Sequence, residues 1–90
     1  MLYNYKKEKI MQTKIAVVAI IVSDLTAVER INSLLHENNQ YIIGRLGLPY
    51  KEKSVSVISV VMDAPQEVIN ALSGKLGMIN CVSSKVLTTK

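Results

Sequence analysis

Cysteine and histidine are nearly absent from this chain of 90 residues, which has one of each, Cys81 and His36. A single cysteine cannot form a disulfide within the chain, and a typical zinc site needs three or four ligands. The composition therefore excludes a disulfide framework and a typical zinc centre, and we expect no metal and no cofactor. Disulfides form in oxidising compartments, and a chain with one cysteine has no internal disulfide. The composition therefore also favours a reducing compartment, and we expect a cytoplasmic protein.

Long apolar runs are missing as well. The longest one, residues 15–22, has eight residues, far short of the roughly 20 that span a bilayer. Basic residues between Lys6 and Lys14 precede it, as in a secretory signal, but no small-x-small cleavage site follows. We therefore expect no membrane segment and interpret residues 15–22 as a buried strand.

The side chains that carry catalysis are sparse. The acidic residues after position 14 fall on predicted caps and polar faces, and no two of them form an evident acid/base pair. His36 lies near the end of a predicted helix, where it is a dipole-compensating cation or a surface residue. Cys81 is interpreted as a small core or edge residue. We expect no enzyme activity and assign no catalytic residue.

The positive charge is concentrated at the amino end. The net charge of the chain is +4, and residues 1–14 hold four lysines against one glutamate. We therefore expect residues 1–13 to form a flexible basic extension and residues 14–90 to form the folded domain. An alternative function follows from the extension: a small nucleic-acid-binding transcriptional regulator that uses it as an electrostatic arm. DNA binding by the domain on its own is not expected.

The apolar pattern predicts four strands. Residues 15–22 and 55–62 are apolar at odd and even positions, which is typical of central strands buried on both faces. Residues 41–48 contain two glycines and run into a proline, which favours an edge position. The mixed polarity of residues 82–88 predicts the other edge.

Two helices alternate with these strands. The first is predicted to begin at Thr26, which has capping-box spacing to Glu29. The second is predicted to begin with Asp63 as its cap and to end at Gly77, a candidate for a left-handed cap. Gly74 is interpreted as a close-packing position in this helix.

The order strand-helix-strand-strand-helix-strand predicts an α+β, ferredoxin-like fold with a four-stranded antiparallel sheet and both helices on one face. The helices cover only one face, yet the central strands are apolar on both. We therefore expect a homo-oligomer, a dimer or tetramer, formed through the sheet or its edges. The alternative is that the N-terminal segment, with Leu2, Tyr3 and Tyr5, folds back over the open face.

Two segments are candidates for binding. The amino end of the first helix, Ser23, Asp24, Leu25 and Thr26, is the better anion site in principle, because helix amino ends carry partial positive charge. On the edge strand, Arg45 stands between two glycines, where a ligand or another chain can approach the backbone. The alternative there is a bulged strand with a solvated arginine.

The same stretches resemble a known family. Gly-Arg-Leu-Gly-Leu-Pro-Tyr at 44–50, Val-Ser-Val-Ile-Ser-Val-Val at 55–61 and Ala-Leu-Ser-Gly-Lys-Leu-Gly at 71–77 look like hallmark stretches of the iron-only hydrogenase system regulators. The resemblance spans about residues 14–89 and implies an ACT-like ferredoxin fold related to the C-terminal domain of nickel-responsive regulators. We assign an oligomer interface or family motif to Gly44, Arg45, Gly47, Pro49, Tyr50, Gly74 and Lys75.

The resemblance implies regulation rather than catalysis. Nickel-responsive regulators use several histidines and a cysteine, and this chain has only one of each, so no nickel site is expected. ACT domains that bind amino acids commonly have an Asp-x-x-Gly-like loop after the first strand, and here Asp24 is present but the glycine is missing. The sequence thus predicts a stand-alone ACT-like regulatory or sensing module that acts through oligomerisation and through a small-molecule effector or a protein partner.

Overall fold

The computed structural model describes residues 12–89 of the chain. The helices and strands in chain order are β1 (Lys14–Val22), α2 (Val28–Glu37), β2 (Ile42–Tyr50), β3 (Val55–Ala64), α3 (Gln66–Gly77) and β4 (Val82–Thr88). Of the flexible basic extension predicted at residues 1–13, residues 1–11 lie outside the described residues, so that prediction is not tested. Residues 12 and 13 precede β1 without regular structure.

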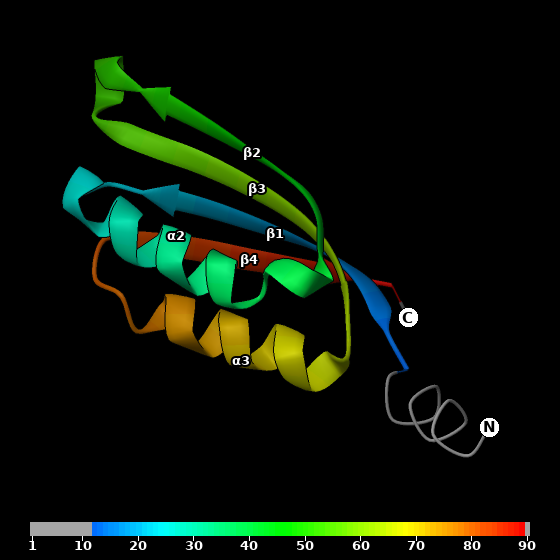
Figure 1. The fold of residues 1–90 in the computed structure, drawn as a ribbon. Helices are drawn as coiled ribbons and strands as arrows, with labels where there is room; N and C mark the ends of the chain where they lie inside the picture. Colours follow the sequence, from blue (N-terminus) through cyan, green and yellow to red (C-terminus); the bar gives the residue numbers. More distant parts are fainter. Residues whose placement is uncertain (1–11, 90) are drawn as a thin grey trace.

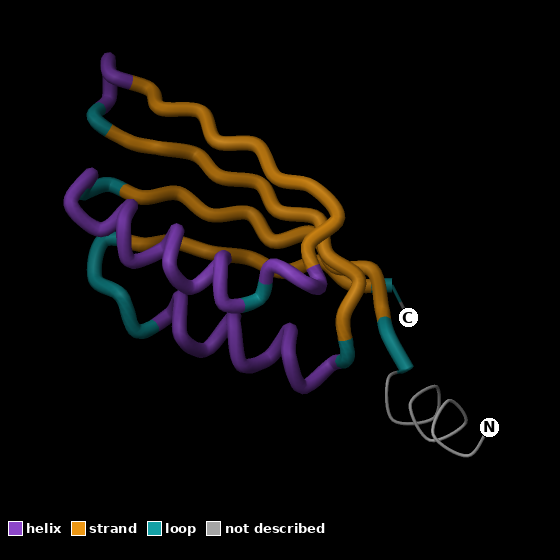
Figure 2. The backbone as a smooth tube through the Cα atoms, viewed as in Figure 1, coloured by secondary structure: helices purple, strands orange, loops and turns teal. Residues whose placement is uncertain are grey.

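The strands form one antiparallel sheet in the order β2-β3-β1-β4. β1 and β3 are central and β2 and β4 are the edges, as the apolar pattern predicted. Both helices lie on one face of the sheet, so the domain has one layer of strands and one layer of helices (Figures 1 and 2). This is the ferredoxin-like arrangement expected from the sequence.

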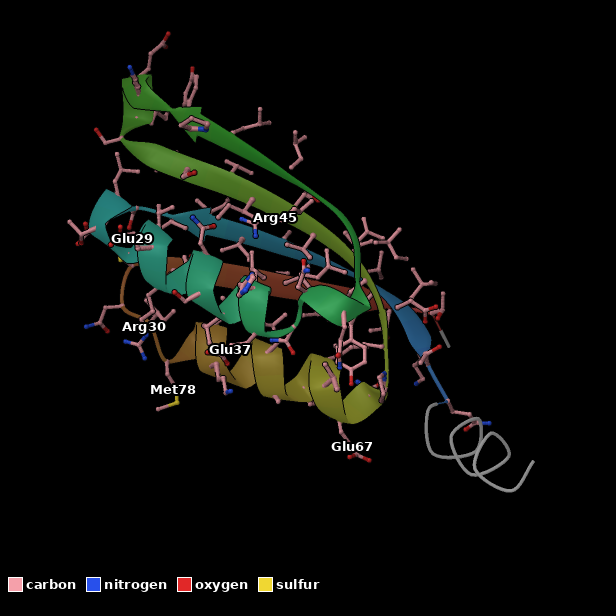
Figure 3. The ribbon with its side chains drawn as sticks, viewed as in Figure 1. Glu29, Arg30, Glu37, Arg45, Glu67 and Met78 are labelled. Carbon is pink, nitrogen blue, oxygen red and sulfur yellow. The ribbon has the colours of Figure 1, made fainter. Side chains whose placement is uncertain are left out.

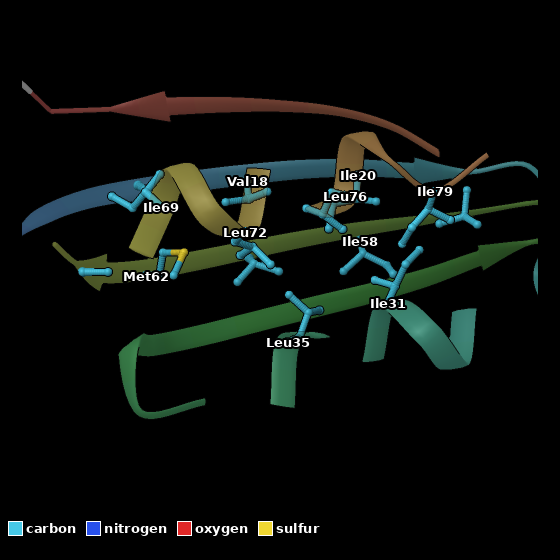
Figure 4. Packing of buried hydrophobic residues seen from close by; sticks show 14 residues of the cluster. Val18, Ile20, Ile31, Leu35, Ile58, Met62, Ile69, Leu72, Leu76 and Ile79 are labelled. Atoms are coloured by element: carbon cyan, nitrogen blue, oxygen red, sulfur yellow. The ribbon is translucent and has the colours of Figure 1, made fainter. Parts of the chain in front are cut away.

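The core lies between the sheet and the helices, and it follows from the two periodicities of the sequence. Every second residue of β1 is buried, from Ala16 to Val22, because alternate strand residues point to the same face. Ile31 and Leu35 of α2, four residues apart on one side of the helix, face these positions. α3 contributes the remaining helical residues, Ile69, Leu72 and Leu76 (Figure 4).

The start of the first helix differs from the capping-box prediction. A 3-10 turn, Leu25–Ala27, precedes α2, and Ala27 caps α2 without a side-chain hydrogen bond. Asp24 is the capping side chain, because its Oδ1 accepts hydrogen bonds from the Thr26 backbone N–H at 2.9 Å and the Thr26 hydroxyl at 2.7 Å. An Asp side chain can accept a hydrogen bond from the amide two residues ahead of it. The resulting Asp24–Thr26 turn forms in place of the predicted cap by Thr26.

Both ends of the second helix differ from the prediction too. Asp63 belongs to β3, where it pairs with Ile15 of β1, and Pro65 is the residue before α3. Gly77 is the last residue of α3 and has no positive φ; the left-handed residue of this connection is Cys81, with φ 66°. Asp63 pairs with β1 as part of the strand ladder and so does not cap the helix. The left-handed conformation occurs at Cys81, directly before β4, and not at the end of α3.

The edge strand β2 is longer at its carboxyl end than predicted. It continues through Pro49 to Tyr50, whereas the sequence pattern ended it at residue 48. Proline lacks a backbone N–H, and an edge strand tolerates this because one side of its ladder has no partner. The ladder with β3 has a register shift between Ile42 and Gly44, which is consistent with the alternative of a bulged strand.

Candidate functional site

Among residues 12–89, no helix lies on one face of the sheet, and we call this face the outer face. Its residues are Ile15, Val17, Ala19 and Ile21 of β1, Gly44, Leu46, Leu48 and Tyr50 of β2, Val55, Val57, Ser59, Val61 and Asp63 of β3, and Ser83, Lys85 and Leu87 of β4. Most of these side chains are apolar. Large ones are exposed on all four strands, including Leu46 at 57% and Leu87 at 73%.

The register makes these apolar side chains neighbours. Val17 lies between Val61 of β3 and Leu87 of β4. Ile21 lies beside Val57, which in turn pairs with Leu48 of β2. Directly paired strand residues stand about 5 Å apart, so the exposed side chains form one continuous patch. The prediction that the second face of the sheet is apolar is confirmed within residues 12–89.

The outer face has two charged residues of opposite sign. Asp63 of β3 pairs with Ile15, and Lys85 of β4 pairs with Ala19. Both are exposed. They stand on different strands, so each is surrounded mainly by apolar neighbours.

A groove lies on the other face, between β2 and the beginning of α2. Its volume is about 430 Å³, and its lining residues are Leu25, Val28, Asn32, Arg45, Gly47, Pro49, Ser56 and Ile58. Arg45, Gly47 and Pro49 point to this side because they alternate with the outer-face residues of β2. In the view of Figure 1, neither α2 nor α3 crosses β2.

Arg45 forms one end of this groove. Its Nη2 donates a 2.6 Å hydrogen bond to Oδ1 of Asn32, which joins β2 to α2. Figure 3 labels Arg45 between the ribbons of β2 and α2 in this view. A second, more polar hollow of about 580 Å³ lies beyond this pair and is lined by Asn32, Ser33, His36, Glu37, Asn39 and Arg45. The guanidinium of Arg45 therefore borders two hollows, one mainly apolar and one polar.

A model of the family described as "TM1266-like: Iron-only hydrogenase system regulator, putative" matches residues 14–86. The chain belongs to this family. The solved structure of the uncharacterized protein TM1266 from Thermotoga maritima is similar to this fold, with a TM-score of 0.84 and 34% sequence identity, and the match covers 88% of this chain and 100% of that one. No curated protein matches the chain.

In this TM1266-like chain, the predicted ligand residues separate into two groups. Leu25 and Arg45 line the same groove, but Ser23, Asp24 and Thr26 do not. Ser23 donates from its N–H and its hydroxyl to the carbonyl of Cys81, at 2.9 and 3.2 Å. Hydrogen bonds from Thr26 hold the pKa of Asp24 below its usual value. The Asp24 carboxylate thus takes the Thr26 donors that a bound anion would need.

The predicted interface or motif residues also separate. Gly44 and Tyr50 lie on the outer face, and Arg45, Gly47 and Pro49 lie on the groove side of β2. Gly74 and Lys75 are exposed on α3, in the opposite layer from the outer face. The structure therefore does not bring these residues together on one surface.

The predictions for Gly74, Lys75 and Cys81 have different outcomes in the structure. A Cβ added at Gly74 meets no atom within 4 Å, so the prediction of close packing there is wrong. Lys75 is a surface charge, as predicted, with its Nζ 3.8 Å from Oε1 of Glu37. Cys81 is exposed rather than part of the core.

The sequence analysis did not predict four of the groove residues, which are Val28, Asn32, Ser56 and Ile58. It assigned Pro49 to the interface or family motif and not to a binding groove. The one available signal was Ser56, a polar residue within an otherwise apolar inner strand face. It is buried, with 7% of its surface exposed. The helix residues Val28 and Asn32 gave no signal, because only the fold places them opposite β2.

Within residues 12–89, no cluster of three or more histidine, cysteine, aspartate or glutamate side chains is arranged to hold a metal ion. No helix among these residues is both long and apolar enough to cross a membrane. The expected cytoplasmic location stays a prediction.

Proposed function

We propose that this member of the TM1266-like family is an ACT-like regulatory module of the iron-only hydrogenase system, which pairs with a second copy through its outer face and responds to a small-molecule effector or a protein partner. Family membership supports the regulatory role. The described residues offer a binding groove and an apolar surface, but no evident pair of groups for acid/base catalysis.

The exposed apolar outer face carries this proposal. Four strands about 4.8 Å apart and about eight residues long present roughly 500 Å² in projection, and more when the relief of the side chains is included. A standard protein interface buries about 800 Å² on each partner. The outer face is thus of the size that a second copy can cover, and most of its exposed side chains would leave water on association.

The two charges on the outer face favour a second copy as the occupant. In a two-fold pair, a surface meets itself, so Asp63 of one copy can lie opposite Lys85 of the other and vice versa. Two sheets can pack face to face about 10 Å apart, as in sandwiches, with their side chains interdigitated. A surface with charges of one sign would instead repel its copy.

The test is the mass of the full-length protein in solution, measured by light scattering for the wild type and for Val17→Lys. Val17 is central on the outer face, so a lysine there would be buried without a partner in the dimer. We expect a dimer or tetramer for the wild type and a monomer for the variant. A wild-type monomer would contradict the proposal and favour cover by the N-terminal segment.

The alternative function, nucleic-acid binding through the basic extension, depends on residues outside the described part of the chain. Residues 12–89 carry seven lysines and arginines against six acids, so the domain has no large excess of positive charge. That alternative stays a prediction, which a salt-dependent DNA-binding measurement on the full chain can test.

A further inference from the structure

The groove beside β2 contains space that no side chain fills, because the residue at position 47 is a glycine. Gly47 lines the groove, and a Cβ built at Gly47 meets no atom within 4 Å. Glycine weakens a strand relative to most residues, and here neither a positive φ nor a close neighbour requires it. A larger residue at this position would occupy the groove. The glycine therefore keeps open a space of about 430 Å³, within the usual range for small-molecule sites.

The lining of the groove defines two kinds of contact. Leu25, Val28, Pro49 and Ile58 supply an apolar surface, and Arg45 supplies a cation at one end. No acidic side chain from the described part of the chain lines the groove. A ligand with an apolar body and a negative charge matches this lining, whereas a cationic ligand finds no partner.

Arg45 is held in place but has no carboxylate partner among residues 12–89. Its Nη2 donates to Asn32, and among the described residues the one ion pair is between Glu37 and Lys75. A guanidinium has five N–H donors in a fixed plane, so the bond to Asn32 leaves others for a ligand. Two parallel donors of an arginine fit the two oxygens of a carboxylate.

We propose that this groove binds a small monocarboxylate with an aliphatic body. The carboxylate lies against the Arg45 guanidinium, and the aliphatic body lies over Leu25, Val28 and Pro49. This inference rests on the proposed sensing function, because it names the class of effector that the module would sense. One cation matches one negative charge, which favours a carboxylate over a phosphate dianion.

The test uses the full-length protein and isovalerate as the probe. A titration followed by amide NMR gives the dissociation constant and shows which backbone amides respond. Isovaleramide, which has the same shape without the charge, and inorganic phosphate, which has charge without the apolar body, are titrated in parallel. We expect saturable shifts at Arg45 and Gly47 with isovalerate and at least about tenfold weaker binding of both comparison compounds.

Three variants identify the site. Arg45→Gln removes the charge, and Gly47→Val fills the groove while adding a residue that favours strands. Both should weaken isovalerate binding at least about tenfold, and thermal melts that match the wild type show that the fold is intact. Arg30→Gln is the matched control, because Arg30 is exposed on α2 and does not line the groove. It should bind like the wild type.

The result that overturns the inference is distinct from the one that overturns the proposed oligomer. The inference fails if isovalerate gives no saturable shifts, if phosphate or isovaleramide binds equally well, or if Arg45→Gln binds like the wild type. Light scattering on the same samples reports the oligomer separately. A dimer that binds no carboxylate refutes the groove assignment alone, and a monomer that binds it refutes the outer-face interface alone.

Discussion

The carbonyl oxygen of Cys81 accepts two hydrogen bonds from Ser23, one from the backbone N–H at 2.9 Å and one from the hydroxyl at 3.2 Å. These bonds join the end of β1 to the residue before β4. Cys81 has φ 66°, in the left-handed region that costs most residues energy. The chain thus fixes the start of its edge strand at the expense of backbone strain at one residue.

Replacing Cys81 with glycine should relieve this strain. Glycine adopts positive φ without a Cβ clash, but it also gains freedom in the unfolded chain. We expect Cys81→Gly to leave the free energy of unfolding unchanged or to raise it by up to about 1 kcal/mol. Cys81→Val should lower it, since β-branched residues tolerate positive φ least. Urea unfolding measures both, and a Gly variant less stable than the Val variant would contradict the account.

Stability should fall in acid partly through Asp24. Hydrogen bonds from Thr26 favour its charged form and lower its pKa in the folded state. Its contribution is therefore fully present above the unfolded pKa, about 3.9, and is lost as the pH falls through the folded value. Asp24→Asn keeps an oxygen that can accept the Thr26 bonds but does not titrate. The stability difference between wild type and variant should shrink below about pH 4; a pH-independent difference would disprove this role.

The core should be sensitive at α3. Leu72 is 1% exposed and packs within the cluster between sheet and helices. Leu72→Ala should lower the free energy of unfolding by about 2–5 kcal/mol, because it removes buried methyl groups and leaves a cavity. Met78, 80% exposed at the end of the same helix, is the control, and Met78→Ala should change stability by less than about 0.5 kcal/mol. Equal effects in chemical unfolding would contradict the packing described.

The charges on the outer face should pair across the proposed interface. Asp63→Lys and Lys85→Asp each leave like charges facing each other in a two-fold pair, so each variant should dissociate at higher protein concentration than the wild type. The double variant restores opposite charges and should recover most of the lost association. Dilution series followed by light scattering give the dissociation constants. A double variant no tighter than either single variant would exclude this pairing.

The strand order was predictable from the sequence because two-sided apolar strands have to be central. Residues 15–22 and 55–62 showed this pattern, and they became β1 and β3 in the middle of the sheet. The same pattern predicted an apolar outer face, and in the structure Val17 and Ile21 are exposed on that face. These features depend on local periodicity, which the sequence carries directly.

The helix caps and the groove were less predictable because they depend on competition and on distant contacts. Thr26 had the spacing of a cap, but in the structure its own backbone N–H donates to the side chain of Asp24, which acts as the cap. Asp63 had the chemistry of a cap, but the ladder with β1 extended far enough to include it. The Arg45–Asn32 hydrogen bond joins a strand to a helix 13 positions away, a contact that no local spacing predicts.

The most direct test of the central claim is the solution mass of full-length wild type, Val17→Lys and Met78→Lys by light scattering at micromolar concentration. Both variants place a lysine at an exposed apolar residue, but only Val17 lies on the outer face. The account predicts an oligomeric wild type, a monomeric but folded Val17→Lys, and a Met78→Lys with the mass of the wild type. A monomeric wild type, or a Val17→Lys variant that keeps the wild-type mass, would contradict it.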